Sequence, residues 1–169
     1  MLLHRQKKQS MLLRKRLSQK RLRTLLRYYP KSGKWIWLTS VGSVKPGRKT
    51  GTGFHIQIDG KKYMTSRLAY LYMTGHWPIL EIDHADLNKK NHRWANLREA
   101  TRQQQCVNRR SKFKNNKTGF KGVRKHPLTP NCWQAFFARK RLGHAHSPEE
   151  AFKLYQDYVE KTFGEFARC

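Results

Sequence analysis

Acidic residues are the scarcest class in this sequence. The 169 residues include 10 Asp and Glu against 37 Lys and Arg, which gives a formal net charge of +27. No acid occurs before Asp59, although that stretch carries 15 Lys and Arg. Because so large a charge opposes compaction, a polyanionic partner would relieve the repulsion. The composition therefore indicates a nucleic acid as the partner, but it gives no information on mechanism.

Cysteine is nearly as scarce, and its spacing excludes two kinds of site. Cys106, Cys132 and Cys169 are widely separated, so the sequence has no CxxC pair and no Cys/His zinc spacing. We therefore expect no structural zinc and no disulfide framework. Free thiols are typical of a reducing cytoplasm, where we expect the protein to act.

Long hydrophobic runs are missing too. No run approaches the ~18–20 apolar residues that a helix needs to cross a bilayer, so we expect no membrane partner. The Arg-rich, acid-free N-terminus has the composition of a mitochondrial transit peptide, but the same basic character continues far beyond it. Aromatic residues, in contrast, are plentiful: 5 Trp, 7 Tyr and 8 Phe exceed what a solvated basic tail carries and indicate packed cores.

Turn and cap signals divide the chain into a basic arm and two small domains. The arm has a loose helical stripe of leucines, and it can equally be interpreted as a solvated tail. A hairpin around Asp59-Gly60 and a helix from a cap at Ser66 to Gly75 are expected in the first domain. In the second domain, the capping box Ser147-Pro148-Glu149-Glu150, with Pro at the first helical position, predicts the start of a helix. The fold class expected is α+β, with an arm, a first domain, a linker and a second domain over residues 1–24, 25–110, 111–118 and 119–169.

The stretch from Glu81 to Thr101 places rare acids beside groups that can do chemistry. A short strand delivers Asp83 and His84, a polar turn reverses the chain, and the returning segment carries Asn96 ahead of an expected short helix. A neutral imidazole can take a proton from water near pH 7, and a carboxylate suits Mg²⁺. The Asn96 amide could hydrogen-bond a ring nitrogen of His84 and set its tautomer. An Asp-His pair at a strand end is more often a polar turn, so both interpretations stay open.

This strand–turn–strand–helix segment, together with the preceding GKKYMTSRLAYLYMTGHWP, resembles the phage-type HNH homing endonucleases, which have a ββα-metal core. The resemblance covers about residues 25–110. It implies hydrolysis of double-stranded DNA with Mg²⁺ or Mn²⁺, without a small-molecule cofactor, by a monomer in the host cytoplasm. The residues it implies are a metal ligand at Asp83, a general base at His84, an orienting Asn96 and a second metal ligand at Gln105.

Three positions depart from that family's pattern. Gln105 stands where the family has Asn, and its extra methylene would weaken the metal site unless Asn108, one turn further, replaces it. Leu87 stands at the usual turn glycine, so Asn88 is expected to take the left-handed position. His92 replaces the usual Asn, and we expect it to be a solvated turn residue.

The C-terminal part shows a second resemblance. Its motifs Gly122-Val123-Arg124, Trp133-Gln134-Ala135, Leu142-Gly143 and Glu149-Glu150-Ala151 resemble the APETALA-two/ethylene-response-factor DNA-binding domain. In that fold a three-stranded sheet enters the major groove and one helix packs behind it. A core role for the tryptophan is as plausible as a DNA-facing one. The DNA-binding residues that this implies are Arg124, Lys125, Trp133, Arg139 and Arg141.

Three functions therefore remain open. The favoured one is an HNH endonuclease that cuts double-stranded DNA. The second is a non-catalytic DNA-binding regulator that uses the C-terminal sheet and has a degenerate core. The third is an RNA-binding or ribosome-associated protein, which explains the charge but not the arrangement of Asp83, His84 and Asn96.

Overall fold

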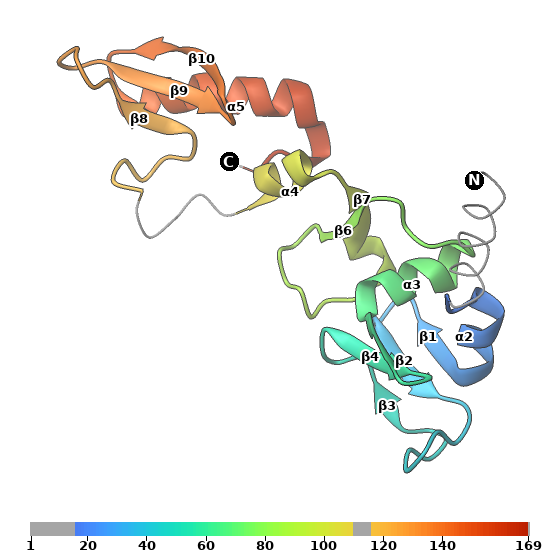
Figure 1. Cartoon of the computed structure of the whole chain (residues 1–169). Helices are drawn as coiled ribbons and strands as arrows, with labels where there is room; N and C mark the ends of the chain where they lie inside the picture. The colour runs from blue at the N-terminus through green and yellow to red at the C-terminus, as the bar shows by residue number, and fades with distance from the viewer. Residues whose placement is uncertain (1–15, 110–115, 169) are drawn as a thin grey trace, which may run out of the picture. The chain divides into compact units, whose positions relative to one another are not determined.

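The structure is a computed structural model that describes residues 16–109 and 116–168. It divides the chain into two compact units, Met1–Glu99 and Ala100–Cys169 (Figure 1). Each unit combines helices with small sheets, so the expected α+β class is confirmed. Most of the expected arm and linker lie outside the described residues. Among the helices that are described, none is long and apolar enough to span a bilayer.

The first unit begins with a short helix that leads into an antiparallel sheet. Helix α2 (Gln19–Leu25) is capped by Ser18, whose side chain accepts a hydrogen bond from the N–H of Arg21. A three-stranded sheet in the order β1-β2-β3 and the β4–β5 hairpin follow. These strands are Leu26–Tyr29, Lys34–Trp37, Lys49–Thr50, His55–Ile58 and Lys61–Met64.

The β4–β5 hairpin confirms the turn expected at Asp59-Gly60. Both residues have positive φ, 48° and 75°, as a two-residue type I′ turn requires. Helix α3 (Thr65–Thr74) follows directly. The cap expected at Ser66 is wrong: the N-cap is Met64, and Ser66 is buried within the first turn of the helix.

The strand, turn and returning strand expected around Asp83 are present. Strands β6 (Glu81–His84) and β7 (Leu97–Ala100) form a two-stranded sheet, and the connection between them ends in the 3-10 helix η1 (Trp94–Asn96). Leu97 belongs to the apolar core of the first unit, so the returning strand is anchored where it begins. The largest fully buried apolar side chains of this core are Leu22, Leu26, Trp35, Ile58, Leu68 and Leu71.

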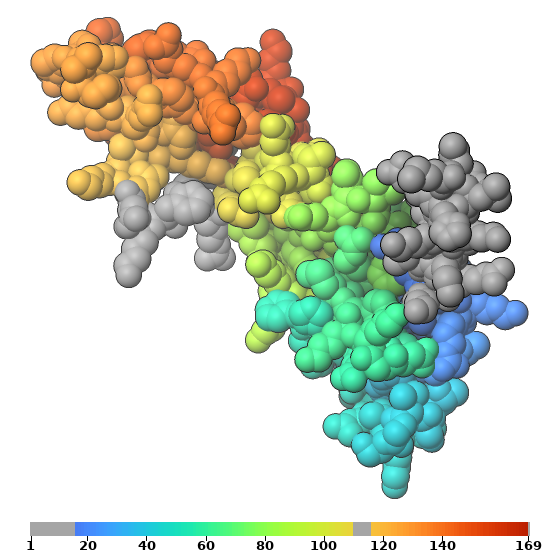
Figure 2. All heavy atoms as spheres, viewed as in Figure 1, coloured from blue at the N-terminus to red at the C-terminus, as the bar shows by residue number. Residues whose placement is uncertain are grey.

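The second unit contains a three-stranded antiparallel sheet and one long helix, whose atoms are orange to red in Figure 2. The sheet order is β10-β9-β8. As expected, Ser147 caps the helix by accepting from the N–H of Glu150, and Pro148 is its first residue. The strands and helices of the unit are α4 (Arg102–Asn108), β8 (Val123–Lys125), β9 (Trp133–Phe137), β10 (Lys140–Ala145), α5 (Pro148–Phe163) and η2 (Gly164–Phe166).

Helix α4 folds with this second unit. Val107 is fully buried in the core that the sheet forms with α5. The ammonium group of Lys121, itself 8% exposed, donates to the backbone carbonyls of Val107 and Arg109 at the C-terminal end of α4. A cation is favourable at that end because the helix dipole is negative there. The sequence places α4 after β7, but its packing partners lie further along the chain.

Candidate active site

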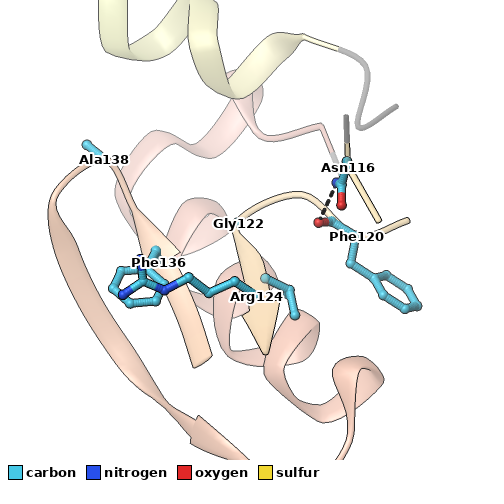
Figure 3. A pocket seen from close by; sticks show the side chains of 7 residues that line it. Asn116, Phe120, Gly122, Arg124, Phe136 and Ala138 are labelled. Atoms are coloured by element: carbon cyan, nitrogen blue, oxygen red, sulfur yellow. Dashed lines mark hydrogen bonds between the residues drawn. The ribbon is translucent and has the colours of Figure 1, made fainter. Parts of the chain in front are cut away.

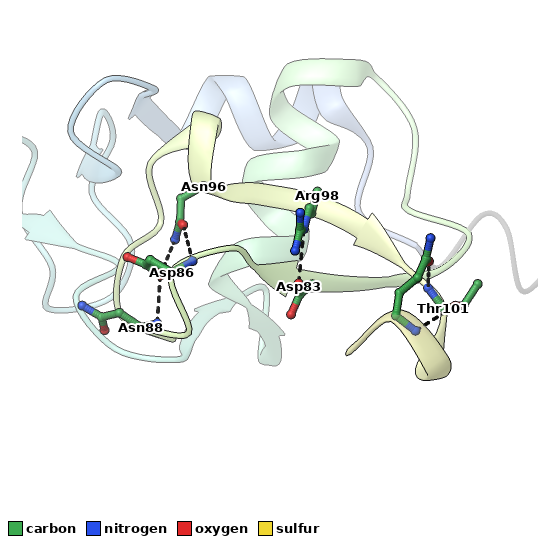
Figure 4. A network of polar contacts seen from close by, with 7 residues as sticks. Asp83, Asp86, Asn88, Asn96, Arg98 and Thr101 are labelled. Atoms are coloured by element: carbon green, nitrogen blue, oxygen red, sulfur yellow. Dashed lines mark hydrogen bonds and ion pairs between the residues drawn. The ribbon is translucent and has the colours of Figure 1, made fainter. Parts of the chain in front are cut away.

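Asp83 is held at the β6–β7 ribbon by an arginine from the returning strand. The Nε of Arg98 donates to Oδ2 of Asp83 at 3.3 Å (Figure 4). The side chain of Asp83 is only 11% exposed and that of Arg98 18%, so water screens this pair less than a surface ion pair. The guanidinium therefore stabilises a charged carboxylate at the position where the sequence predicts a metal ligand.

A polar network closes the turn that follows His84. Asp86 accepts from the N–H of Asn88 at 2.8 Å and from the side-chain amide of Asn96 at 2.9 Å (Figure 4). It also accepts from the side-chain amide of Asn91 at 2.7 Å. Burial raises the pKa of Asp86, but these hydrogen bonds outweigh it and leave that pKa below its usual value. Asp86 was missed by the sequence reasoning, although its signal was visible as one of few acids within the turn.

Asn96 directs its hydrogen bonds to the turn that follows His84. Its Nδ2 group donates to Asp86 Oδ1 and to the Asn91 carbonyl, both at 2.9 Å, and its Oδ1 accepts from the N–H of Asp86 at 3.0 Å. Both amide hydrogens are therefore used within the turn. The expected donation from the Asn96 amide to a ring nitrogen of His84 is wrong, because the amide donates to Asp86 and to the Asn91 carbonyl.

Leu87 itself takes the left-handed conformation, with φ of 67°. The expectation that Asn88 would do so is wrong. Asn88 instead donates its N–H to Asp86 and accepts from the N–H of Lys90, which fits it into the turn with negative φ. A left-handed leucine costs about 1–2 kcal/mol, which the Asp86 network must offset.

The ring of His84 is paired with a second histidine. His84 Nε2 lies 3.4 Å from Nδ1 of His92, and His92 Nε2 lies 3.2 Å from the carbonyl oxygen of Gly53. His92 is 3% exposed, so the expectation of a solvated turn residue is wrong. Its own carbonyl accepts from the Tyr28 hydroxyl at 2.5 Å, and Gly33 packs so closely that a Cβ there would lie 2.6 Å from the His92 carbonyl carbon.

Burial decides the protonation of both imidazoles. Burial, with a smaller contribution in the same direction from the neighbouring His92, lowers the pKa of His84 to about 4. Burial likewise lowers the pKa of His92. Both rings are therefore neutral at pH 7, and a neutral imidazole is the form that can accept a proton from water.

The donor atoms fit a hard cation that keeps most of its waters. Among the described residues, no group of three or more His, Cys, Asp and Glu side chains could enclose a metal. Mg²⁺ is often held by one or two carboxylates together with substrate phosphates and waters, and the Asp83 carboxylate suits this arrangement. Gln105 lies half-buried on α4, in the second unit, and its part in metal binding stays a prediction.

A separate cationic surface lies on the second unit, on the side of the sheet away from α5. Val123 and Ala135 face α5, so the alternation along the strands places Arg124 and Gln134 on the opposite side. Arg124 Nε donates to Gln134 Oε1 at 3.2 Å, and its guanidinium lies 3.9 Å from the ring centre of Phe136 (Figure 3). Arg124 and Phe136 border an open hollow of about 410 Å³.

The other residues expected to bind DNA differ in their placement. Lys125, Arg139 and Arg141 are exposed, with Arg139 in the turn between β9 and β10. Trp133 is half-buried and packs against the core between the sheet and α5. Trp133 lies two residues before the fully buried Ala135 on β9, so the two side chains are on the same side of the sheet. This packing favours a core role for Trp133.

A comparison with known protein families matches the part of the chain that contains β6, the turn, β7 and most of α4. The HNH endonuclease family matches residues 63–107. An uncharacterized HNH endonuclease of Acanthamoeba polyphaga mimivirus is 33% identical over 122 residues, which cover 69% of this chain and 62% of that relative. No solved structure matches significantly. Residues 63–107, which include Asp83 and His84, thus match the HNH endonuclease family.

Proposed function

We propose that this protein is a divalent-metal-dependent HNH endonuclease of the homing type, which hydrolyses phosphodiester bonds in double-stranded DNA. The observation that carries the proposal is the half-buried, neutral imidazole of His84 directly after the Asp83 carboxylate, within the segment that matches the family. The net charge of +27 supports a polyanionic substrate. We further propose that it acts as a monomer in the cytoplasm of a phage-infected cell.

The proposed chemistry assigns one task to each side chain. His84 takes a proton from a water whose oxygen attacks phosphorus, the bond from phosphorus to the departing oxygen breaks, and solvent protonates the leaving group. Asp83, with Gln105 as the predicted second ligand, would hold the cation. A bound divalent cation supplies charge stabilisation at the phosphate. Asn96 and Asp86 keep the turn after His84 in place through their hydrogen bonds.

The test is the relaxation of supercoiled plasmid carrying candidate target sequences, with Mg²⁺ or Mn²⁺ and with excess EDTA. We expect nicked or linear product only with the metal, and we expect duplex DNA to compete better than RNA of equal length. A second candidate, a DNA-binding regulator with a degenerate core, is favoured by the Arg98 pairing at Asp83 and by Gln105 in place of Asn. Binding without cutting under every metal condition would support that regulator instead.

We also propose that the β8–β10 sheet reads DNA, as the resemblance to the APETALA-two/ethylene-response-factor domain implies. The sheet with one helix behind it supports this, and so do Arg124 and the exposed Lys125, Arg139 and Arg141. The Arg124 guanidinium stacks on the Phe136 ring and donates to the Gln134 amide oxygen. It is therefore oriented before DNA binds, and this limits the conformational entropy that it loses on binding. Arg124 is therefore the residue proposed to contact a base.

Arg124→Ala should weaken binding to the target site by about 1–3 kcal/mol and reduce discrimination against variant sites. Arg141→Ala should weaken binding to all sequences and reduce the salt slope of log K by about 1. Both effects can be measured by fluorescence anisotropy over a range of salt concentrations. Lys153→Ala, on the exposed side of α5, is the matched control and should change neither quantity. If Arg124→Ala and Lys153→Ala change the affinity and the discrimination equally, the β8–β10 sheet is not the surface that contacts the bases.

A further inference from the structure

Three groups form a continuous line from the backbone to the ring of His84. The Gly53 carbonyl oxygen lies 3.2 Å from His92 Nε2, and His92 Nδ1 lies 3.4 Å from His84 Nε2. The two ring centres are 5.4 Å apart and their planes are inclined by 58°. All three residues belong to the first unit. His92 has no role among the residues that the family resemblance implies, and its burial needs an explanation.

The chemistry of these groups allows one assignment of hydrogens. A carbonyl oxygen can only accept, so His92 must carry its hydrogen on Nε2 to bond Gly53. A neutral imidazole has one N–H, so His92 Nδ1 then carries a lone pair and accepts. His84 Nε2 must therefore be the donor to His92. His84 is left with an unprotonated Nδ1, because its single hydrogen is on Nε2.

We propose that His92 is the positioning residue for His84: with the Gly53 carbonyl it fixes the Nε2–H tautomer of His84, so that Nδ1 is the nitrogen that takes the proton from water. The inference rests on the proposed function, in which His84 is the base. After proton transfer, both ring nitrogens of His84 carry hydrogens, and the Nε2–H still points to the lone pair of His92. A neutral acceptor of this kind stabilises the imidazolium that forms and holds the ring in one orientation.

The fold holds His92 from three sides, which makes a positioning role possible. The Tyr28 hydroxyl donates to its carbonyl, and Trp94 N–H donates to the Pro30 carbonyl at 2.9 Å, which ties the following residues to the β1–β2 turn. Gly33 in that turn has φ of 71° and leaves no space for a Cβ beside the His92 backbone. His92 is thus fixed by a hairpin about sixty residues earlier in the chain.

The tautomer can be measured without any cleavage reaction. Long-range nitrogen–proton NMR correlations of the ¹⁵N-labelled full-length protein at pH 7 distinguish a protonated from an unprotonated ring nitrogen. We expect His84 and His92 both to carry the hydrogen on Nε2. An Nδ1–H form of His84 would overturn the proposal, whether or not the protein cuts DNA. If the tautomer is as expected but no cutting is found, the proposed function fails while the assignment of hydrogens stands.

Two substitutions then test whether the contact matters for the reaction. His92→Leu removes the acceptor and should lower the cleavage rate by about 10- to 100-fold, the usual effect of losing the partner that orients a histidine. It should also give a mixture of His84 tautomers. His92→Asn places an amide oxygen near the position of Nδ1 and should recover most of the rate and the Nε2–H form.

The matched controls are His76→Leu and His76→Asn, because His76 is an exposed histidine of the same unit. Both should cut DNA at the rate of the unchanged protein. A folded His92→Leu protein that keeps the full rate, or a His92→Asn protein as slow as His92→Leu, would refute the positioning role. Should His92→Leu fail to fold, the tautomer of the unchanged protein and the rate of His92→Asn still decide the matter.

Discussion

His84→Ala should reduce the rate of DNA cleavage by about 10²–10⁴-fold, the range that loss of a general base produces. The half-buried ring of His84 is neutral at pH 7, which is the form that can accept a proton from water. His92 is a poor substitute, because it is only 3% exposed and the Gly53 carbonyl holds its ring in place. The rate is measured by single-turnover plasmid cleavage with Mg²⁺ at saturating protein.

Binding must be measured on the same variant to separate chemistry from affinity. The affinity of His84→Ala for duplex DNA should be unchanged, because the positive charge that attracts phosphates lies elsewhere on the chain. His76→Ala, which changes an exposed histidine of the same unit, should retain both cutting and binding. Full cutting by pure His84→Ala protein would show that this ring is not the base.

Asp83→Asn should be the second most damaging change. Asn keeps the size of the side chain and one oxygen but loses the charge that a divalent cation needs. A metal ion contributes several kcal/mol at the transition state, so we expect a loss of at least about 10²-fold at fixed Mg²⁺. The metal concentration that gives half-maximal cutting should rise as well. Both quantities come from a titration of the cleavage rate with Mg²⁺ and with Mn²⁺.

The chain offers a close control for that experiment. Asp59 also pairs with an arginine, because Arg21 Nη2 lies 3.0 Å from its Oδ1, but its side chain is 53% exposed in the β4–β5 turn. Asp59→Asn therefore removes an Asp–Arg pair without touching the site, and its metal dependence should match that of the unchanged protein. If Asp83→Asn and Asp59→Asn behave alike, Asp83 has no part in holding a cation.

Local rules were sufficient for the elements that surround the site. The Asp59-Gly60 hairpin, the end of α3 at Gly75 and the Ser147 cap of α5 were all predicted correctly. Each of these depends on the conformational preference of one or two residues, which does not need the rest of the fold. The same reasoning put Asp83 and His84 at the end of a strand, which β6 confirms.

Predictions about side-chain partners depended on contacts that no local pattern reveals. Asn96 was expected at the ring of His84, but its hydrogen bonds run to Asp86 and Asn91. The sequence left open which side of its strand Trp133 faces, and the structure packs it against the core between the sheet and α5. Hydrogen-bond partners are chosen by distance within the folded chain, and this distance is set by the core.

The sequence by itself determined the α+β elements, the charge that indicates a nucleic acid, and the pairing of Asp83 with His84 on one strand. Only the tertiary structure decided that His92 is buried, that it lies against His84, and that Tyr28, Gly33 and Gly53 hold it there. The physical reason is that strands and turns form from neighbouring residues, whereas burial of a polar side chain depends on which distant segments close over it.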